Sequence, residues 1–117
     1  MTQRQKTEKK LDDIVRDIIK KRDEKRGCIT CGQNCALTTG HFMKRRHLAT
    51  RWNLTNVNGQ CWECNSKDDW EEYKAAMITK YGEPVTESII SLARLDIRFT
   101  TAELEEKYER LKSIHNF

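Results

Sequence analysis

Two Cys-x-x-Cys pairs frame the chemically reactive residues of this chain. Cys28 and Cys31 form the first pair, and Cys61 and Cys64 form the second. A tight turn aims both thiolates of a pair inward, and two such pairs complete the tetrahedral four-sulfur set that structural zinc prefers. The spacing therefore predicts a zinc site that pins the base of a long loop between Cys31 and Cys61.

Two disulfides are the alternative interpretation of the same four cysteines. They require an oxidising compartment, and no apolar segment or cleavage site ahead of Cys28 indicates export. The fifth cysteine, Cys35, is left over. We expect a small side chain or free thiol there, with replacement of a zinc ligand or redox chemistry as the alternatives.

One histidine and two asparagines stand at positions suited to phosphodiester chemistry. His41 follows Gly40, Asn56 lies shortly before Cys61, and Asn65 follows Cys64 directly. A neutral imidazole, with an ordinary pKa of about 6.5, can take a proton from an attacking water near neutral pH. The side-chain oxygen of Asn65 can bind a hard divalent ion, Mg²⁺ or Mn²⁺, that stabilises charge on the phosphate.

Each of these residues also has a purely structural interpretation. His41 could be a hydrogen-bonded surface side chain, and Asn56 could simply shape a turn. Asn65 or Ser66 would suit the N-cap of the following helix, which needs no metal. The spacing between the three residues favours catalysis, with Asn56 holding the geometry of the loop.

A basic loop lies between His41 and Asn56. It contains Lys44, Arg45, Arg46, His47 and Arg51, and Trp52 follows. Arginine offers planar donors to phosphate oxygens, so we expect this loop to bind the DNA backbone, with Arg51 as a candidate transition-state clamp. A solvated charged loop is the alternative. Trp52 is expected to pack in the core, and no base-reading element is evident.

The order of these motifs resembles that of known nucleases. Gly40-His41-Phe42, the run from Asn56-Val57 through Gln60-Cys61 to Cys64-Asn65, and the Tyr81-Gly82-Glu83 turn carry the resemblance. Together they resemble the HNH (ββα-metal) nucleases with a zinc-ribbon staple and, more narrowly, the NinG (Rap) recombination proteins of lambda-like phages.

The resemblance implies a metal-dependent DNA endonuclease working in phage recombination or DNA processing. His41 would be the general base, Asn65 the protein ligand of the catalytic ion, and DNA, including branched or single-stranded forms, the substrate. Many HNH sites carry an acidic metal ligand immediately before the histidine, where this chain has Gly40. Thr38, His47 or a water are the candidates for that coordination position.

Composition and charge favour a small domain with a polyanionic partner. Charged residues make up 34% of the 117 residues and hydrophobic residues 37%, so a metal staple is expected to supplement a modest core. Lysine and arginine outnumber acidic residues by ten to six in residues 1–26 and by four to one in residues 27–65. In residues 66–117 the acidic residues are in excess, with eleven against eight lysines and arginines. Positive charge therefore lies with the first two segments.

Periodicity predicts an N-terminal helix. Residues 1–10 are polar and expected to be frayed, and from Lys9 to Lys25 an apolar stripe recurs at helical spacing until Gly27; its members are Leu11, Ile14, Val15, Ile18 and Ile19. The basic residues near its end could hold phosphates or form a solvated helix face. Residues 32–40 are expected to be a loop, followed by a short strand around His41.

Three helices are expected after Asn65. Trp70, Tyr73, Met77 and Tyr81 form an apolar stripe that should pack on the zinc-bound segment and end at Gly82. A second helix is predicted over Val85–Leu95, burying Ile89, Ile90, Leu92 and Ala93. A third opens with the capping box of Thr100 and Glu103 and buries Leu104, Tyr108 and Leu111.

These expectations combine into one α+β domain. It comprises an N-terminal helical arm (1–26), a zinc-stapled HNH core (27–82) and a C-terminal helical extension (83–117). No apolar run is long enough to span a bilayer, so we expect no membrane partner and a location in the cytoplasm, that of the host cell if the gene belongs to a phage. A non-catalytic zinc-ribbon module that binds nucleic acid, or an adaptor docking through its C-terminal helices, is the alternative function. Subunit number stays open, with a homodimer as one option.

Overall fold

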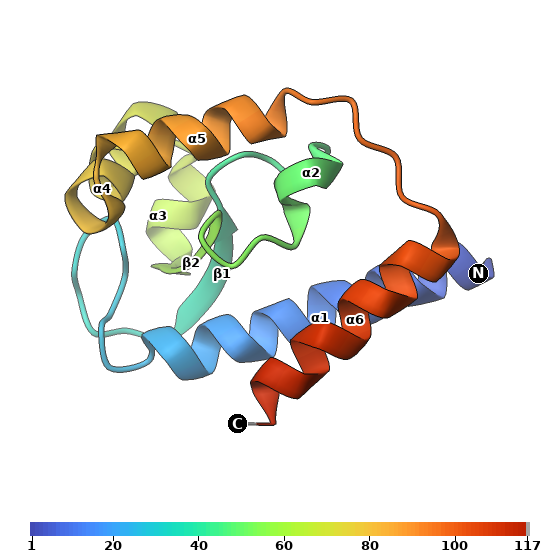
Figure 1. Ribbon diagram of the computed structural model, residues 1–117. Coiled ribbons are helices and arrows are strands. Elements are labelled where there is room, and N and C mark those ends of the chain that lie inside the picture. Colours follow the sequence, from blue (N-terminus) through green and yellow to red (C-terminus); the bar gives the residue numbers. More distant parts are fainter. Residues whose placement is uncertain (117) are drawn as a thin grey trace.

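The computed structural model describes residues 1–116, which form helices around a single β-hairpin (Figure 1). In chain order the elements are α1 (Gln3–Asp23), β1 (Leu37–His41), α2 (Leu48–Arg51), β2 (Val57–Cys61), α3 (Trp62–Lys67), α4 (Trp70–Tyr81), α5 (Glu83–Ala93) and α6 (Thr101–His115). None of the described helices is long and apolar enough to cross a membrane. The predicted α+β class is confirmed.

The hairpin and the helix after it form a ββα unit. Strands β1 and β2 are antiparallel, with Leu37 opposite Cys61 and His41 opposite Val57. Helix α3 begins immediately after Cys61 and packs on both strands. This unit brings His41, at the end of β1, close in space to Asn65, within α3.

Helix α1 begins earlier than its apolar stripe indicates. Thr2 caps it with a complete capping box, in which the Thr2 hydroxyl accepts from Gln5 N–H and the Gln5 side chain accepts from Thr2 N–H. The expectation that residues 1–10 are frayed is therefore wrong, because the cap satisfies backbone donors that would otherwise open the first turn. The predicted stripe itself is buried, from Leu11 to Ile19.

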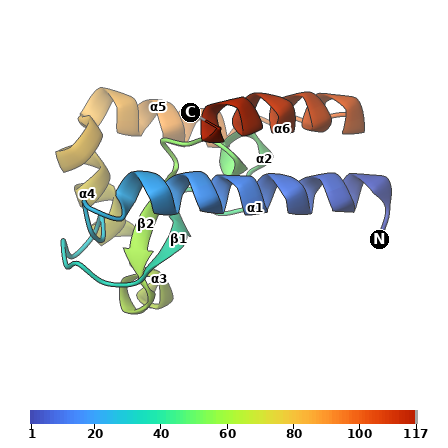
Figure 2. The ribbon, with the colours of Figure 1, turned by 90° about the horizontal axis from the view of Figure 1, so that it is seen from below.

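The first hydrophobic cluster joins the two ends of the chain. Helix α6 lies alongside α1 and runs in the same direction (Figures 1 and 2). The stripe of α1 packs there with Leu104 and Leu111 of α6, and with Trp52 and Val57 from the loop and β2. The burial expected for Trp52, Leu104 and Leu111 is confirmed, while Tyr108 is half-buried at the margin of the cluster.

The second hydrophobic cluster lies where α4 and α5 meet the end of β1. Tyr73 and Met77 of α4 pack with Ile89 and Ile90 of α5 around Phe42. Phe42 stacks on Trp70, with ring centroids 5.5 Å apart, and the Tyr73 hydroxyl donates to the Gly40 carbonyl at 2.7 Å. The predicted stripe of α4 therefore does attach this helix to the hairpin.

Helix boundaries differ from the predicted ones in two places. Helix α5 starts at Glu83 rather than Val85, directly after Gly82, whose φ of 89° ends α4. Asn65 and Ser66 lie inside α3 and cap nothing, because Cys61 caps α3 and Asp69 caps α4. The capping interpretation of Asn65 is therefore wrong, and α3 ends in left-handed backbone at Asp68.

Candidate functional site

Four cysteines converge at the base of the hairpin. The sulfur atoms of Cys28, Cys31, Cys61 and Cys64 all lie within 4.8 Å of one another, and the Cys31 and Cys61 sulfurs are 3.8 Å apart. Zn–S bonds of about 2.3 Å in a tetrahedron would separate the sulfurs by about 3.8 Å. All five cysteines of the described chain are free of disulfides. The four-sulfur set can hold a structural zinc ion, as the spacing predicts.

Both Cys-x-x-Cys turns are shaped by their own backbone. Cys31 N–H points to the Cys28 sulfur and Cys64 N–H to the Cys61 sulfur, each at 3.5 Å. At Gly27, where φ is 80°, an added Cβ would come within 2.7 Å of the Gln33 carbonyl oxygen. The first turn thus requires glycine at its entry, and the second turn is also the first turn of α3.

The close approach of four ionisable thiols favours the binding of a cation. Burial raises the pKa of Cys28, but backbone N–H groups of Cys31, Cys61 and Thr30 outweigh it and lower the pKa to about 7. Burial and the three neighbouring cysteines raise the pKa of Cys64. Four thiols this close cannot all ionise beside one another unless a positive ion compensates their charge.

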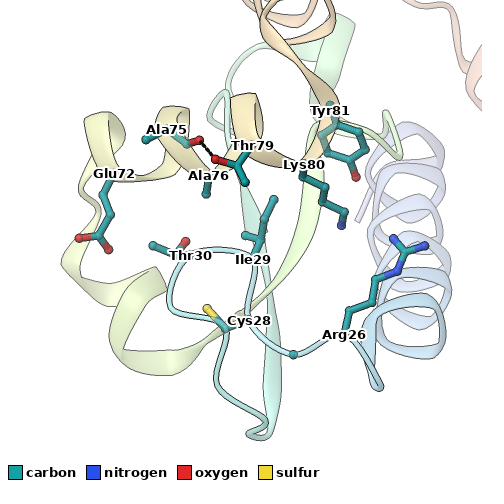
Figure 3. A pocket seen from close by; sticks show the side chains of 11 residues that line it. Arg26, Cys28, Ile29, Thr30, Glu72, Ala75, Ala76, Thr79, Lys80 and Tyr81 are labelled. Carbon is teal, nitrogen blue, oxygen red and sulfur yellow. Dashed lines mark hydrogen bonds between the residues drawn. The ribbon is translucent and has the colours of Figure 1, made fainter.

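Two further features border the cysteine cluster. Cys35 is half-buried and stays outside the four-sulfur set, in agreement with a free thiol. A groove of about 810 Å³ runs between the first turn and α4, with Ile29 at its centre, Glu72 at one end, and Arg26 and Lys80 at the other (Figure 3). The groove exposes one side of the Cys28 turn at the molecular surface.

The imidazole of His41 has a defined tautomer. Its Nε2 lies 2.9 Å from the backbone carbonyl oxygen of Arg51. Because a carbonyl oxygen only accepts, Nε2 must carry the proton and donate, which leaves Nδ1 of the neutral ring with a free lone pair. His41 therefore presents a proton acceptor at a fixed orientation.

The surroundings of His41 keep the ring neutral. Burial has the largest effect and lowers its pKa, and the hydrogen bond to the Arg51 carbonyl raises it by the next largest amount. The charges of Arg45 and Arg51 lower the pKa, Asp12 raises it, and the pKa ends below its usual value. The half-buried ring lines a cavity of about 390 Å³ between β1 and α1, which Arg45, Arg51 and Asp12 also line. We name this hollow the His41 cavity.

Asn56 is fully buried and holds the ends of the basic loop. Its Oδ1 accepts from Met43 N–H at 2.8 Å, and its Nδ2 donates to the carbonyls of Met43 and Thr50, each at 3.0 Å. These contacts fix the loop that supplies the Arg51 carbonyl to His41. The amide does not face the His41 cavity, whose lining it does not join.

Asn65 lies on the exposed surface of α3, next to β1. Its Nδ2 donates to Thr38 Oγ1 at 3.0 Å and approaches the Thr39 carbonyl at 3.5 Å, and its Oδ1 has no hydrogen-bond partner among residues 1–116. Asn65 and His41 both line a narrow hollow together with Lys44 and Asp68. The hairpin thus brings the two predicted residues to the same region.

Gly40 has no room for a side chain. A Cβ there would come 1.9 Å from the Gln60 Oε1 atom, and Gln60 is buried and tied to the Thr30 hydroxyl through Nε2 at 2.8 Å. An acidic residue before His41 would therefore displace a buried, hydrogen-bonded side chain. Within residues 1–116, the four cysteines form the single group of three or more Cys, His, Asp or Glu side chains able to share an ion.

Helix α1 supplies partners for Arg51 that sequence reasoning missed. Arg51 makes a two-point contact with Asp12, Nε to Oδ1 at 3.1 Å and Nη2 to Oδ2 at 2.7 Å, and reaches Glu8 at 3.4 Å. Asp12 also accepts from Trp52 Nε1 and from Arg45. Burial raises the pKa of Asp12, but these bonds and charges lower it below its usual value. Arg51 is thus mostly buried and already paired.

The predicted DNA-binding residues are spread over three hollows. Arg45 and Arg51 line the His41 cavity, Lys44 lies beside Asn65 and contacts Asp68, and Arg46 and His47 line a separate groove. The loop therefore does not form one continuous patch; consecutive residues face different sides of the molecule.

A buried polar network around β2 was also missed. Asp23 accepts from Arg22 and from Gly59 N–H, and Arg22 donates to the carbonyls of Leu54 and Val57. Asn58 extends the network to Tyr73 and Tyr81 of α4. An acidic residue in the last turn of a helix opposes the helix dipole, and this was the available signal that Asp23 has a special partner.

The class of protein defined by these features is a small α+β domain with a ββα unit and a four-cysteine site able to hold zinc. A family model described as bacteriophage lambda NinG protein matches residues 1–115. The chain belongs to the NinG family of phage proteins. No curated protein and no solved structure matches the chain.

Proposed function

We propose that this protein is an HNH-type DNA endonuclease that works in phage recombination or DNA processing within the cytoplasm of the host cell. The observation that carries the proposal is the His41 imidazole, whose Nε2 is held by the Arg51 carbonyl while Nδ1 is left as a proton acceptor. The lowered pKa of His41 keeps that acceptor available at neutral pH.

The proposed reaction is the attack of water on a phosphodiester of DNA. Nδ1 of His41 takes the proton as the water oxygen bonds to phosphorus and the bond to the leaving 3′ oxygen breaks. Asn56 positions the base indirectly, through the loop whose carbonyl holds Nε2. Arg45 lines the His41 cavity with an exposed guanidinium that is paired with Asp12, and we assign it to contact with a phosphate there.

Mg²⁺ or Mn²⁺ would neutralise charge on the phosphate and the leaving oxygen. Asn65 Oδ1 is the protein atom we assign to that ion, because it is exposed and lacks another partner within residues 1–116. One amide oxygen is not a complete ligand set. Mg²⁺ commonly keeps several waters and binds substrate phosphates, so DNA itself would supply much of the coordination.

The test is cleavage of supercoiled plasmid with Mg²⁺ or Mn²⁺. His41→Asn is the sharpest variant, because its neutral amide is smaller than the ring and fits the same space but cannot act as a base near pH 7. We expect nicking by the wild type and a loss of about 10² to 10⁴-fold in the variant, with zinc content and DNA affinity retained. His115→Asn, at the far end of α6, is the matched control and should cut normally.

Equal cutting by His41→Asn would reject His41 as the base. Binding without cutting on plasmid, single-stranded and branched DNA would favour the alternative, a non-catalytic zinc-bearing DNA-binding or adaptor protein. Two observations favour that alternative: Arg51 is already paired with α1, and Gly40 leaves no room for an acidic metal ligand.

A further inference from the structure

We propose that a basic groove between the loop after β1 and the α5–α6 connection binds the phosphodiester backbone of DNA. The groove has a volume of about 910 Å³ and is separate from the His41 cavity, with which it shares no lining residue. Its charged lining comprises Arg4, Arg46, Arg94, Asp96 and Arg98, and His47 also lines it. The inference rests on DNA being the substrate and adds a binding surface that the HNH motif does not contain.

The groove is assembled from three segments that are far apart in the sequence. Arg4 comes from the first turn of α1, Arg46 and His47 from the loop before α2, and residues 93–99 from the end of α5 and the chain after it. Figure 1 shows this last segment passing α2 on its way to α6, which starts close to the N-terminus. Positive charge from all three segments therefore gathers at one place.

Of the four arginines that line the groove, Arg4 is paired with Glu8 at 3.8 Å, and the positive charge of the other three is largely uncompensated. Arg46 and Arg94 are exposed and have no salt-bridge partner among residues 1–116. Arg98 meets only Asp96, at 3.8 Å, and both side chains are more than four-fifths exposed, so water screens the pair. Arg51 in the His41 cavity differs, because Asp12 and Glu8 already occupy its donors. Phosphate oxygens would find free donors in the groove.

The backbone of the groove is held in place. Arg4 donates to the Phe99 carbonyl, and the Phe99 ring packs against Trp52 with centroids 6.3 Å apart. Trp52 is buried in the cluster between α1 and α6. The connection carrying Arg94 and Arg98 is thus fixed to the core at its far end, which reduces the ordering cost of binding an extended polyanion.

The loop after β1 links the groove to the proposed catalytic residue. Arg45 lines the His41 cavity, whereas its neighbour Arg46 lines the groove. A DNA strand whose phosphates lie in the groove would therefore pass along the same loop that bears Arg45 and holds His41. The groove would position the backbone, and the His41 cavity would receive the phosphate to be cut.

The test is the salt dependence of DNA binding, measured by fluorescence anisotropy with a labelled duplex and no added Mg²⁺ or Mn²⁺. In the double variant Arg94→Gln with Arg98→Gln, we expect weaker binding and a slope of log K against log salt that is shallower by about 2, since each phosphate contact contributes about 0.9. Asp96→Asn should bind more tightly than the wild type, because it removes the one acid from the groove.

The matched control removes two exposed positive charges elsewhere. Arg110→Gln with Lys112→Gln lies on α6, outside the groove, and should keep the wild-type slope. An unchanged slope in the Arg94 and Arg98 variant, or an equal change in the α6 control, would overturn the proposal that the groove binds DNA. Circular dichroism checks that each variant is folded. Failure of the nuclease proposal would show separately, as absence of cutting with the groove-dependent slope intact.

Discussion

At the scale of single residues, His41 and Asn56 act as a pair through the backbone. The Asn56 amide fixes Met43 and Thr50, and the next carbonyl, that of Arg51, holds Nε2 of His41. The asparagine thus orients the imidazole without touching it. Two residues fifteen positions apart can therefore depend on one another without direct contact.

Asn56 offers a direct test of this arrangement. Asn56→Asp keeps an acceptor for Met43 N–H but loses the donor to the Met43 and Thr50 carbonyls and adds a buried negative charge. We expect the free energy of unfolding in urea to fall by about 2–4 kcal/mol, since each unsatisfied buried polar group costs about 1–3 kcal/mol. Asn34→Asp, in the exposed loop before β1, should change it by less than about 0.5 kcal/mol. An equal effect of the two variants would contradict the role of Asn56.

The sequence allowed part of this site to be predicted. Cysteine spacing identified the four sulfurs, because each Cys-x-x-Cys pair is a local turn that brings its two sulfurs to the same side. The partners of Arg51 could not be predicted, because Asp12 lies 39 residues away on a helix whose apolar face alone gave a signal. The lack of room at Gly40 depends likewise on Gln60 across the hairpin.

At the scale of elements, a buried ion pair attaches the end of α1 to β2. Asp23 receives Arg22 Nε at 2.8 Å and Gly59 N–H at 2.8 Å, and an added Cβ at Gly59 would come within 3.1 Å of Asp23. Burial raises the pKa of Asp23, but the bonds from Arg22 and Gly59 and the charges of Arg22 and Lys80 lower it below its usual value. The helix is therefore joined to the hairpin by charge as well as by apolar packing.

This ion pair should make stability depend on pH in the acid range. Because the pKa of Asp23 is lower in the folded chain, its contribution is complete above the unfolded value of about 3.9 and is lost as pH falls through the lower folded value. We expect Asp23→Asn to lower the free energy of unfolding by about 3 kcal/mol at pH 7. Below about pH 4 the stability of the variant should fall less steeply with pH than that of the wild type. Urea unfolding at pH 7 and at lower pH measures both effects.

Asp17→Asn is the control for this prediction. Asp17 lies on the same helix, and its ion pair with Arg16 is nearly half exposed. The Asp17→Asn variant should lose less than about 1 kcal/mol of unfolding free energy, and its stability should depend on acid pH as that of the wild type does. If Asp17→Asn flattened the acid dependence as much as Asp23→Asn, the buried pair would not be its source.

Elements with regular patterns were predicted better than their boundaries. The apolar stripes of α1, α4 and α6 follow from helical periodicity and face the core, although Trp70, Tyr81 and Tyr108 are only half-buried. The start of α1 was misplaced because polar residues follow Thr2, although Thr2 and Gln5 already contain the capping box. The N-caps of α3 and α4, Cys61 and Asp69, likewise depend on local turns that the pattern of apolar residues does not predict.

At the scale of the whole molecule, the four-cysteine site ties the hairpin, the first turn and α3 together. These segments contribute few large apolar side chains to the two clusters, chiefly Val57 of β2 in the first and Ile29 of the first turn at the margin of the second. Metal binding should therefore supply much of the stability of this part, and the α1–α6 cluster should be less affected.

Removal of zinc tests this division. We expect one zinc per chain by elemental analysis, lost in Cys31→Ser and on strong chelation, with a loss of several degrees or more in Tm. Cys35→Ser is the matched control, because Cys35 lies outside the set and should keep both zinc and Tm. Full stability after zinc loss would contradict a structural role for the site.

The pairing of α1 with α6 also has a consequence for synthesis. Leu11 and Ile18 of α1 find Leu104 and Leu111 only after some ninety further residues have been joined, since α6 begins at Thr101. Until then the part of the α1 stripe that α6 covers is exposed on the nascent chain, and only residues such as Trp52 and Val57 can pack on the rest. Such late closure slows folding and invites self-association, so truncation before α6 should yield aggregates rather than a smaller working domain.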